Sequence, residues 1–175
     1  MSKQALFNFI VAKEDRSITV ERSFAAPLDL VWSAWTDPAI LCQWWAPKPY
    51  ECVITSLDIR AGGRWSYYMK GPEGDCHHCF FDYETVVPKS SFSGTDGFCD
   101  GQGVINTEMP RMRWANRFSP SEGGTVVCVV IHFDFLEDLE KIIEMGFKEG
   151  FTRGLEQLEE LFANTTYYHG TKADR

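Results

Sequence analysis

Aromatic side chains are the residues of this sequence best suited to chemistry, because they can bind a flat or apolar molecule. The chain has 13 Phe, 6 Trp and 6 Tyr among 175 residues, or 14% aromatic residues. Such rings line pockets, but they also fill cores. The candidate ligand contacts are Trp44, Trp45, Trp65, Tyr67, Met69, Phe81, Tyr83, Trp114, Phe118, His132, Phe147 and Phe151. Burial stabilises both arrangements, so the sequence leaves open whether these side chains surround a cavity or fill it.

The segment Cys76-His77-His78-Cys79 contains four potential soft metal ligands. If the segment is a strand, Cys76 and His78 face one way while His77 and Cys79 face the other. A turn could bring the four together, but no second pair with metal-ligand spacing follows. We therefore expect no metal, and interpret the segment as the entry to a strand with incidental thiols.

His132 is the candidate for proton transfer. It shares strand parity with Val126, Cys128 and Val130, so an inward orientation of that face would place its imidazole at the end of a cavity. The alternative is a hydrogen-bonded histidine at a strand end. The carboxylates considered as its partners are Asp58, Asp82, Glu84 and Glu108.

Other classes of function leave no signature. The sequence has no nucleophile elbow, phosphate-binding loop or dinucleotide fingerprint, so we expect no cofactor. The net charge of −8 argues against nucleic acid as a partner. No apolar run approaches the roughly 18–20 residues that span a bilayer. The first residues do not resemble a secretory signal, so we expect reduced cysteines and a cytoplasmic location.

The elements that must position these residues follow from periodicity. Alternation predicts a first strand from Ile18 to Phe24, and spacings of three and four then predict two short helices up to Trp44. Further strands are expected at 52–59, 64–70, 78–87, 91–98, 111–118 and 125–133. Short turns between them predict an antiparallel meander.

One long helix is expected over residues 136–162, which contain no Pro and an apolar residue every three or four positions. Gly146, Gly150 and Gly154 recur every four residues along it. Each glycine costs up to about 1 kcal/mol relative to Ala, so a packing reason is expected. Two reasons are open: close approach to the sheet, or space for a ligand.

Four motifs resemble one family. They are Phe24-Ala25-Ala26-Pro27 leading to residues 31–38, Trp44-Trp45-Ala46-Pro47, residues 58–65 (DIRAGGRW), and residues 146–151 (GFKEGF). In this order they resemble the homologues of the activator of the heat-shock-protein-90 ATPase, in the START-like (Bet v-like, SRPBCC) superfamily. The resemblance implies an α+β helix-grip fold, with a curved antiparallel sheet wrapped around a long C-terminal helix. Residues 1–17 would form an arm or extra strand, 18–162 the domain, and 163–175 a flexible tail.

The resemblance implies three functions. The first is binding of a hydrophobic or aromatic small molecule between sheet and helix, oriented by His132, Tyr67 or Tyr83. The second is a cyclase or dehydratase that uses His132 or a tyrosine as acid or base. The third is an accessory domain of a chaperone in the stress response, acting through its outer surface. We favour binding over catalysis.

Overall fold

A curved antiparallel sheet and four helices make up residues 5–169, the part of the chain that this computed structural model describes. The elements in chain order are β1 (Phe7–Ala12), β2 (Ser17–Phe24), α1 (Leu28–Thr36), α2 (Pro38–Leu41), β3 (Glu51–Leu57), β4 (Arg64–Lys70), β5 (Cys76–Val87), β6 (Ser91–Cys99), β7 (Arg113–Ser121), β8 (Gly124–His132), α3 (Leu136–Glu144) and α4 (Phe147–His169). Neighbouring strands follow the order β1-β2-β8-β7-β6-β5-β4-β3. This is the expected helix-grip architecture, and the segment before Ile18 contributes the edge strand β1.

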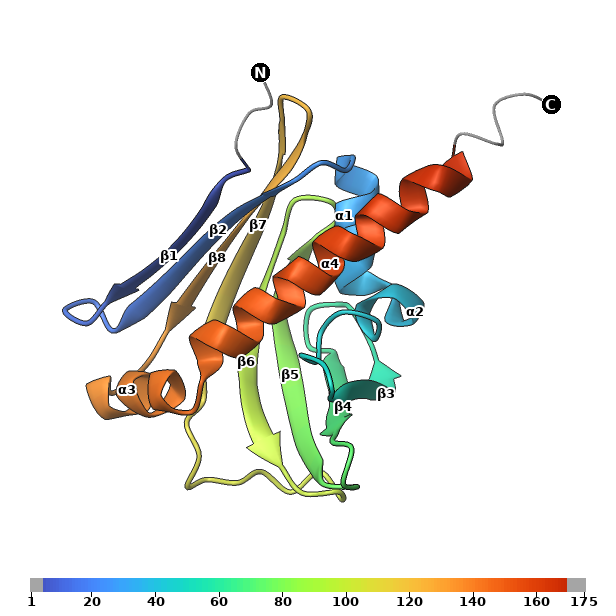
Figure 1. Cartoon of the computed structure of the whole chain (residues 1–175). Coiled ribbons are helices and arrows are strands. Elements are labelled where there is room, and N and C mark those ends of the chain that lie inside the picture. Colours follow the sequence, from blue (N-terminus) through green and yellow to red (C-terminus); the bar gives the residue numbers. More distant parts are fainter. Residues whose placement is uncertain (1–4, 170–175) are drawn as a thin grey trace.

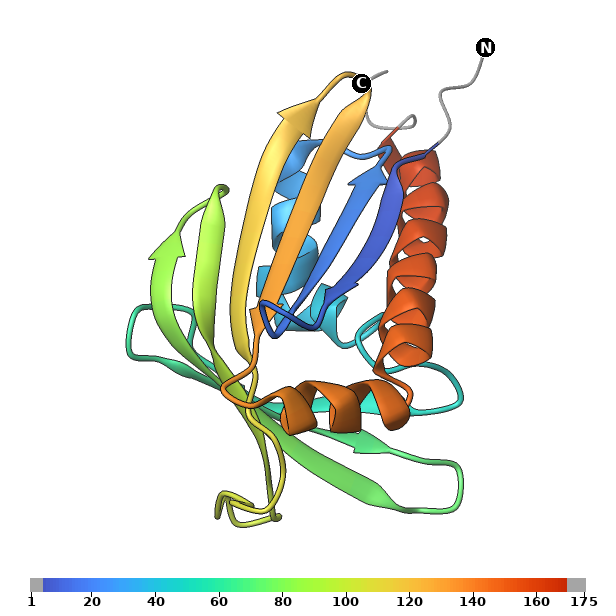
Figure 2. The same cartoon turned by 90° about the vertical axis from the view of Figure 1, so that its left-hand side faces the viewer.

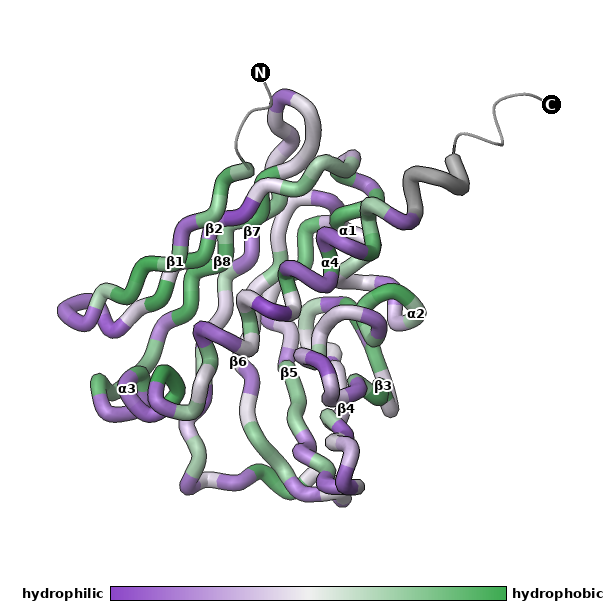
Figure 3. Tube along the Cα trace, in the orientation of Figure 1, coloured by the Kyte–Doolittle hydropathy of each residue, from purple (hydrophilic) through white to green (hydrophobic). Residues whose placement is uncertain are grey.

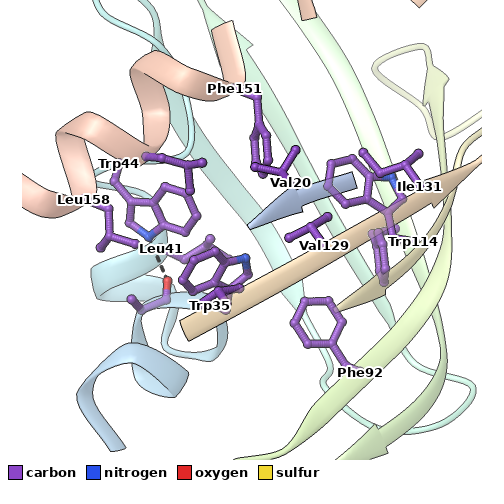
Figure 4. Packing of buried hydrophobic residues seen from close by; sticks show 14 of the residues in the cluster. Val20, Trp35, Leu41, Trp44, Phe92, Trp114, Val129, Ile131, Phe151 and Leu158 are labelled. Carbon is purple, nitrogen blue, oxygen red and sulfur yellow. Dashed lines mark hydrogen bonds between the residues drawn. The ribbon is translucent and has the colours of Figure 1, made fainter. Parts of the chain in front are cut away.

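The concave face of the sheet is built from alternating apolar residues. On β2, Ile18 and Val20 are buried, and they pair directly with Ile131 and Val129 on β8. Successive strand residues point to opposite faces, so the alternation gives the sheet one apolar layer. Figure 4 shows Val20, Val129 and Ile131 together in this layer.

Helix α4 crosses this concave face diagonally, and the sheet bends around it (Figures 1 and 2). Leu155, Leu158 and Phe162 on α4 are buried in the shared core. Trp44, from the segment after α2, is fully buried beneath the helix, and its Nε1 donates a hydrogen bond to the Ala34 carbonyl oxygen at 2.8 Å (Figure 4). Helix α1 contacts β7 and β8 beside this core.

The expectation of one continuous helix over residues 136–162 is wrong. Helix α3 ends at Glu144, and α4 begins at Phe147 in a different direction (Figure 2). Gly146 between them has a φ of +91°, a left-handed conformation that glycine adopts without steric cost and that commonly terminates helices. Apolar residues keep the same spacing of three or four before and after this junction, so the sequence pattern does not reveal that the helix ends there.

The expected end of the helix at residue 162 is also wrong, because α4 continues to His169. The expected tail residues 170–175 lie outside the described part of the chain.

Hydropathy along the chain follows the fold. Hydrophilic residues gather at the turn between β1 and β2, whereas β1 and β8 themselves are largely apolar (Figure 3). Within residues 5–169, no helix is long and apolar enough to cross a membrane.

Candidate functional site

A cavity of about 260 Å³, partly open to solvent, lies between the sheet and the junction of α3 and α4. Its lining residues are Tyr67, Met69, Cys79, Asp96, Gly97, Phe98, Met112 and Trp114 on the sheet side, Ile142, Met145, Gly146, Phe147, Gly150 and Phe151 on the helical side, and Trp45 and Pro47 from the segment after α2. Aromatic and aliphatic side chains dominate this wall, as is usual for small-molecule sites.

Trp45 is the central ring of the wall. Its ring centroid lies 5.1 Å from that of Trp65, 6.1 Å from those of Trp114 and Phe151, and 6.4 Å from that of Tyr67. Its Nε1 donates a hydrogen bond to Tyr67 Oη at 3.1 Å. These contacts join the segment after α2 to β4, β7 and α4, so Trp45 fixes three walls relative to one another.

The first turn of α4 supplies a pair of stacked rings. Phe147 and Phe151 are one helical turn apart, with centroids separated by 5.4 Å and planes inclined by 13°. Both lie edge-to-face on Trp114 of β7, at 6.1 and 5.8 Å. This arrangement follows from the i, i+4 spacing, which places both side chains on one face of a helix.

The three regularly spaced glycines have three different roles. Gly146 ends a helix through its positive φ. A Cβ added at Gly150 would approach only Pro47 Cγ, at 3.8 Å, so this glycine opens space at the cavity wall. A Cβ at Gly154 would lie 3.3 Å from the Trp44 carbonyl oxygen, so this glycine permits close approach to the segment after α2. The close approach at Gly154 is therefore to the segment after α2 and not, as expected from the sequence, to the sheet, whereas a role of Gly150 in making space for a ligand stays a prediction.

Asp96 is the acidic group of the cavity, and the sequence interpretation missed it. Its Oδ1 accepts a hydrogen bond from the Met112 backbone N–H and its Oδ2 accepts one from Trp114 Nε1, both at 2.9 Å. Burial raises the pKa of Asp96 to about 7, against the opposing effects of these two donors and of the Arg111 charge. A signal was present in the sequence: Asp96 shares strand parity with Phe92 and Phe98, which also face inward.

Two further titratable groups, Tyr67 and Cys79, face the cavity beside Asp96. Burial raises the pKa of Tyr67 well above its usual range. Burial also raises the pKa of the Cys79 thiol to about 12. Both groups are therefore neutral near pH 7, and each could donate or accept a hydrogen bond.

Half of the predicted contacts line this cavity: Trp45, Tyr67, Met69, Trp114, Phe147 and Phe151. Trp65, Phe81 and Tyr83 instead surround an adjoining void of about 20 Å³, which is room for one water molecule. Trp44 and Phe118 are buried core residues that line neither space. Trp44, Trp65, Phe81, Tyr83 and Phe118 therefore do not line the main cavity, because their rings pack in the core next to it, and their role as ligand contacts stays a prediction.

His132 does not face the cavity, so the condition under which it could transfer a proton there is not met. Its parity partners Val126, Cys128 and Val130 occupy the outer, half-buried face of β8, and the His132 side chain is exposed. Apolar residues occupy both faces of β8 in the sequence. The alternation of residues therefore could not show which face of the strand points inward. Asp82 likewise faces outward, where it pairs with Arg64 at 2.6 Å.

The four residues 76–79 do not converge. Cys76 and His77 are exposed, whereas Cys79 is buried at the cavity. The His77 ring instead bonds to the Asp75 carboxylate, with Nε2 and Oδ2 3.0 Å apart. Among residues 5–164, whose side chains the structure describes, no three His, Cys, Asp or Glu side chains are grouped so that they could hold a metal ion.

Comparison with known proteins agrees with this architecture. The chain matches the family model "Activator of Hsp90 ATPase homolog 1-like protein" over residues 25–163. Protein Ms6760 from Mycobacterium smegmatis has 28% sequence identity and a TM-score of 0.83, with 90% of this chain and 96% of that chain covered. A protein from Arthrobacter aurescens has 26% identity and a TM-score of 0.85, with coverages of 90% and 91%. No protein with a curated description matches.

The family match covers most of the chain, including the cavity walls on both the sheet and α4. The SRPBCC, or START-like, fold commonly binds hydrophobic ligands. The chain belongs to the family of activator of Hsp90 ATPase homolog 1-like proteins, within the START-like superfamily.

Proposed function

We propose that this protein binds a small hydrophobic or aromatic molecule in the cavity between the sheet and α4. The observation that carries the proposal is a space of about 260 Å³ with predominantly apolar walls, partly open to solvent and bordered by the buried core. A ligand in this cavity is removed from water and contacts aromatic rings of both the sheet and α4, so the hydrophobic effect and dispersion supply its affinity.

The size of the cavity limits the ligand. An apolar cavity of about 150 Å³ admits benzene. The space here is larger than that but lies below the usual range of about 300–1,000 Å³ for drug-sized ligands. We therefore expect a ligand with one or two rings, or an aliphatic group of similar volume.

Naphthalene is a suitable probe because it is apolar, uncharged and of this size. Binding to the folded state alone raises the melting temperature, and the gain in stability grows as RT ln(1 + [L]/Kd). We expect naphthalene to raise the melting temperature of the wild type in a concentration-dependent manner. Calorimetric titration gives the affinity directly.

Two substitutions at one position separate cavity binding from surface binding. Gly150→Met places a flexible apolar side chain in the cavity, whereas Gly150→Ala adds one methyl group that meets only Pro47. Both residues are better helix formers than Gly, so neither variant should unfold. We expect Gly150→Met to lose the naphthalene response and Gly150→Ala to retain it. Equal responses of both variants, or no response of the wild type, would contradict the proposal.

An acid–base enzyme acting in the same cavity is a second candidate. The observation that favours it is Asp96, a carboxyl group on the cavity wall with a pKa of about 7, where proton transfer is most effective. In an enzyme, Asp96→Asn should abolish turnover and largely retain binding. A change in Hsp90 ATPase rate that Gly150→Met leaves intact would instead favour an accessory role through the outer surface.

A further inference from the structure

The carboxylate of Asp96 lies on the cavity wall, and no cationic side chain in the described part of the chain forms a hydrogen bond or an ion pair with it. We propose that the cavity selects hydrophobic amines, whose protonated nitrogen pairs with the Asp96 carboxylate while the apolar part lies among the aromatic rings. This inference rests on the proposed function, because it names the class of molecule that the same cavity takes.

The hydrogen bonds of Asp96 leave room for such a ligand. The Met112 N–H and Trp114 Nε1 each occupy one carboxylate oxygen. An ionised carboxylate has about four acceptor positions, so both oxygens retain acceptor capacity. Both existing donors are neutral, and they hold the carboxylate in place without neutralising its charge.

The guanidinium group of Arg111 lies on the outer face of the sheet, opposite the cavity. Arg111 Nε donates a hydrogen bond to the backbone carbonyl oxygen of Asp96 at 3.2 Å, not to its carboxylate. The Arg111 guanidinium lies 5.2 Å from the centroid of the Phe80 ring and 3.8 Å from Asp82 Oδ2, and Asp82 faces outward. Its charge lowers the pKa of Asp96 at a distance, but less than burial raises it. Among the described residues, no Lys, Arg or His lines the cavity.

The other titratable groups that face Asp96 cannot supply a positive charge to pair with its carboxylate. Tyr67 from β4 and Cys79 from β5 are neutral near pH 7, since burial raises the pKa of each. No side chain that the structure describes on α3, on α4 or in the Trp45–Pro47 segment is both titratable and in the cavity wall. A protonated amine is therefore the missing complement, and it would avoid the cost of burying an unpaired charge.

The aromatic wall favours the same class of ligand. Trp114, which donates to Asp96, also contacts Phe147, Phe151 and Trp45. The faces of aromatic rings attract cations, and the attraction strengthens when the cation leaves water. A ligand amine at Asp96 thus lies next to a group of rings that stabilises its charge as well as its apolar part.

The pH dependence of binding has a definite sign. Pairing requires ionised Asp96 and a protonated amine, and burial raises the pKa of Asp96 to about 7. Below that pH the fraction of protein molecules with an ionised Asp96 falls. The affinity for the amine should therefore weaken by up to tenfold for each pH unit below about 7. An apolar ligand should show no such dependence.

A matched set of probes tests the inference. 2-Phenylethylamine and propylbenzene have the same shape, but one ends in an ammonium and the other in a methyl group, and 3-phenylpropanoate ends in a carboxylate. At about pH 8, we expect the amine to bind at least tenfold more tightly than propylbenzene and the carboxylate to bind most weakly. The preference for the amine should disappear at about pH 5, a comparison that needs no variant.

Asp96→Asn provides the control, because it removes the charge and keeps an amide of similar size. We expect the variant to bind propylbenzene normally, which shows that it is folded, and to lose the preference for the amine. Equal affinity of amine and propylbenzene at about pH 8, or a preference that survives in Asp96→Asn, would overturn the inference alone. Failure of every probe to bind would overturn the proposed function together with it.

Discussion

Gln157 Nε2 donates a hydrogen bond to the carbonyl oxygen of Trp44 at 3.0 Å, although 113 residues separate them in sequence. The same nitrogen donates to the Ala46 carbonyl oxygen at 2.9 Å, and Gln157 Oε1 accepts from the Lys48 N–H at 2.9 Å. This buried amide therefore holds the segment that carries Trp45 and Pro47 against α4. Because both residues line the cavity, the position of α4 determines its shape.

Gln157→Ala should destabilise the protein and impair the cavity. The substitution leaves two buried carbonyl oxygens and one N–H without their partner, and each unsatisfied buried group costs about 1–3 kcal/mol. We expect a loss of about 3 kcal/mol in unfolding free energy, measured by urea denaturation, and weaker naphthalene binding.

Glu156→Ala is the matched control for Gln157→Ala. Glu156 is the preceding residue of α4, is exposed, and pairs only at the surface with Arg153, at 3.3 Å. Its removal should change stability by no more than about 0.5 kcal/mol. Similar losses in the two variants would show that the buried amide does not hold the segment.

The same Gly-to-Ala change should have opposite effects at Gly146 and Gly150. At Gly146 the φ of +91° strains any L side chain, although the space there is open, so we expect a loss of about 1–3 kcal/mol. At Gly150 the backbone is helical and the added Cβ is tolerated, so we expect a gain of up to about 1 kcal/mol. Melting temperatures of the two variants measure the contrast. Equal signs would refute the different roles of these glycines.

Asp96 should make stability fall as the pH rises. A free Asp carboxyl has a pKa near 3.9, and burial raises that of Asp96 to about 7. Between these values the folded protein binds more protons than the unfolded chain, so ionisation opposes folding. The contribution of Asp96 is most favourable at about pH 4 and is lost by about pH 7, with a slope of up to about 1.4 kcal/mol per pH unit.

The comparison with Asp96→Asn isolates this effect, because all other titrating groups are shared. Urea denaturation between about pH 4 and pH 8 should show an unfolding free energy that declines relative to the variant as pH rises. Parallel pH curves for the two proteins would mean that Asp96 titrates normally and is not desolvated.

Much of the fold was predictable from sequence because alternation and helical spacing report burial directly. Trp65, Tyr67 and Met69 were expected on one face of a strand, and the structure places them there. The break at Gly146 was not predicted, since apolar residues keep their spacing on both sides of it. Only the turn itself, which requires a positive φ, distinguishes two helices from one.

The site was less predictable, for two physical reasons. A ring that fills the core, such as Phe118, and a ring that borders a cavity, such as Phe151, have the same chemistry and periodicity. A parity argument also needs to know which face is inward, and this failed for His132. Asp96 was missed because a single carboxylate between Gly94 and Gly97 resembles an exposed strand residue, although its parity with Phe92 indicated otherwise.

Methionine methyl groups provide the most direct test of a ligand-accessible cavity. Met69, Met112 and Met145 line it from the sheet and from the junction of α3 and α4, whereas Met109 does not. In protein labelled with ¹³C at the methionine methyls, titration with naphthalene should shift the signals of the first three in a saturable manner and leave that of Met109 unchanged. Unchanged signals for Met69, Met112 and Met145 at saturating naphthalene would contradict binding between the sheet and α4.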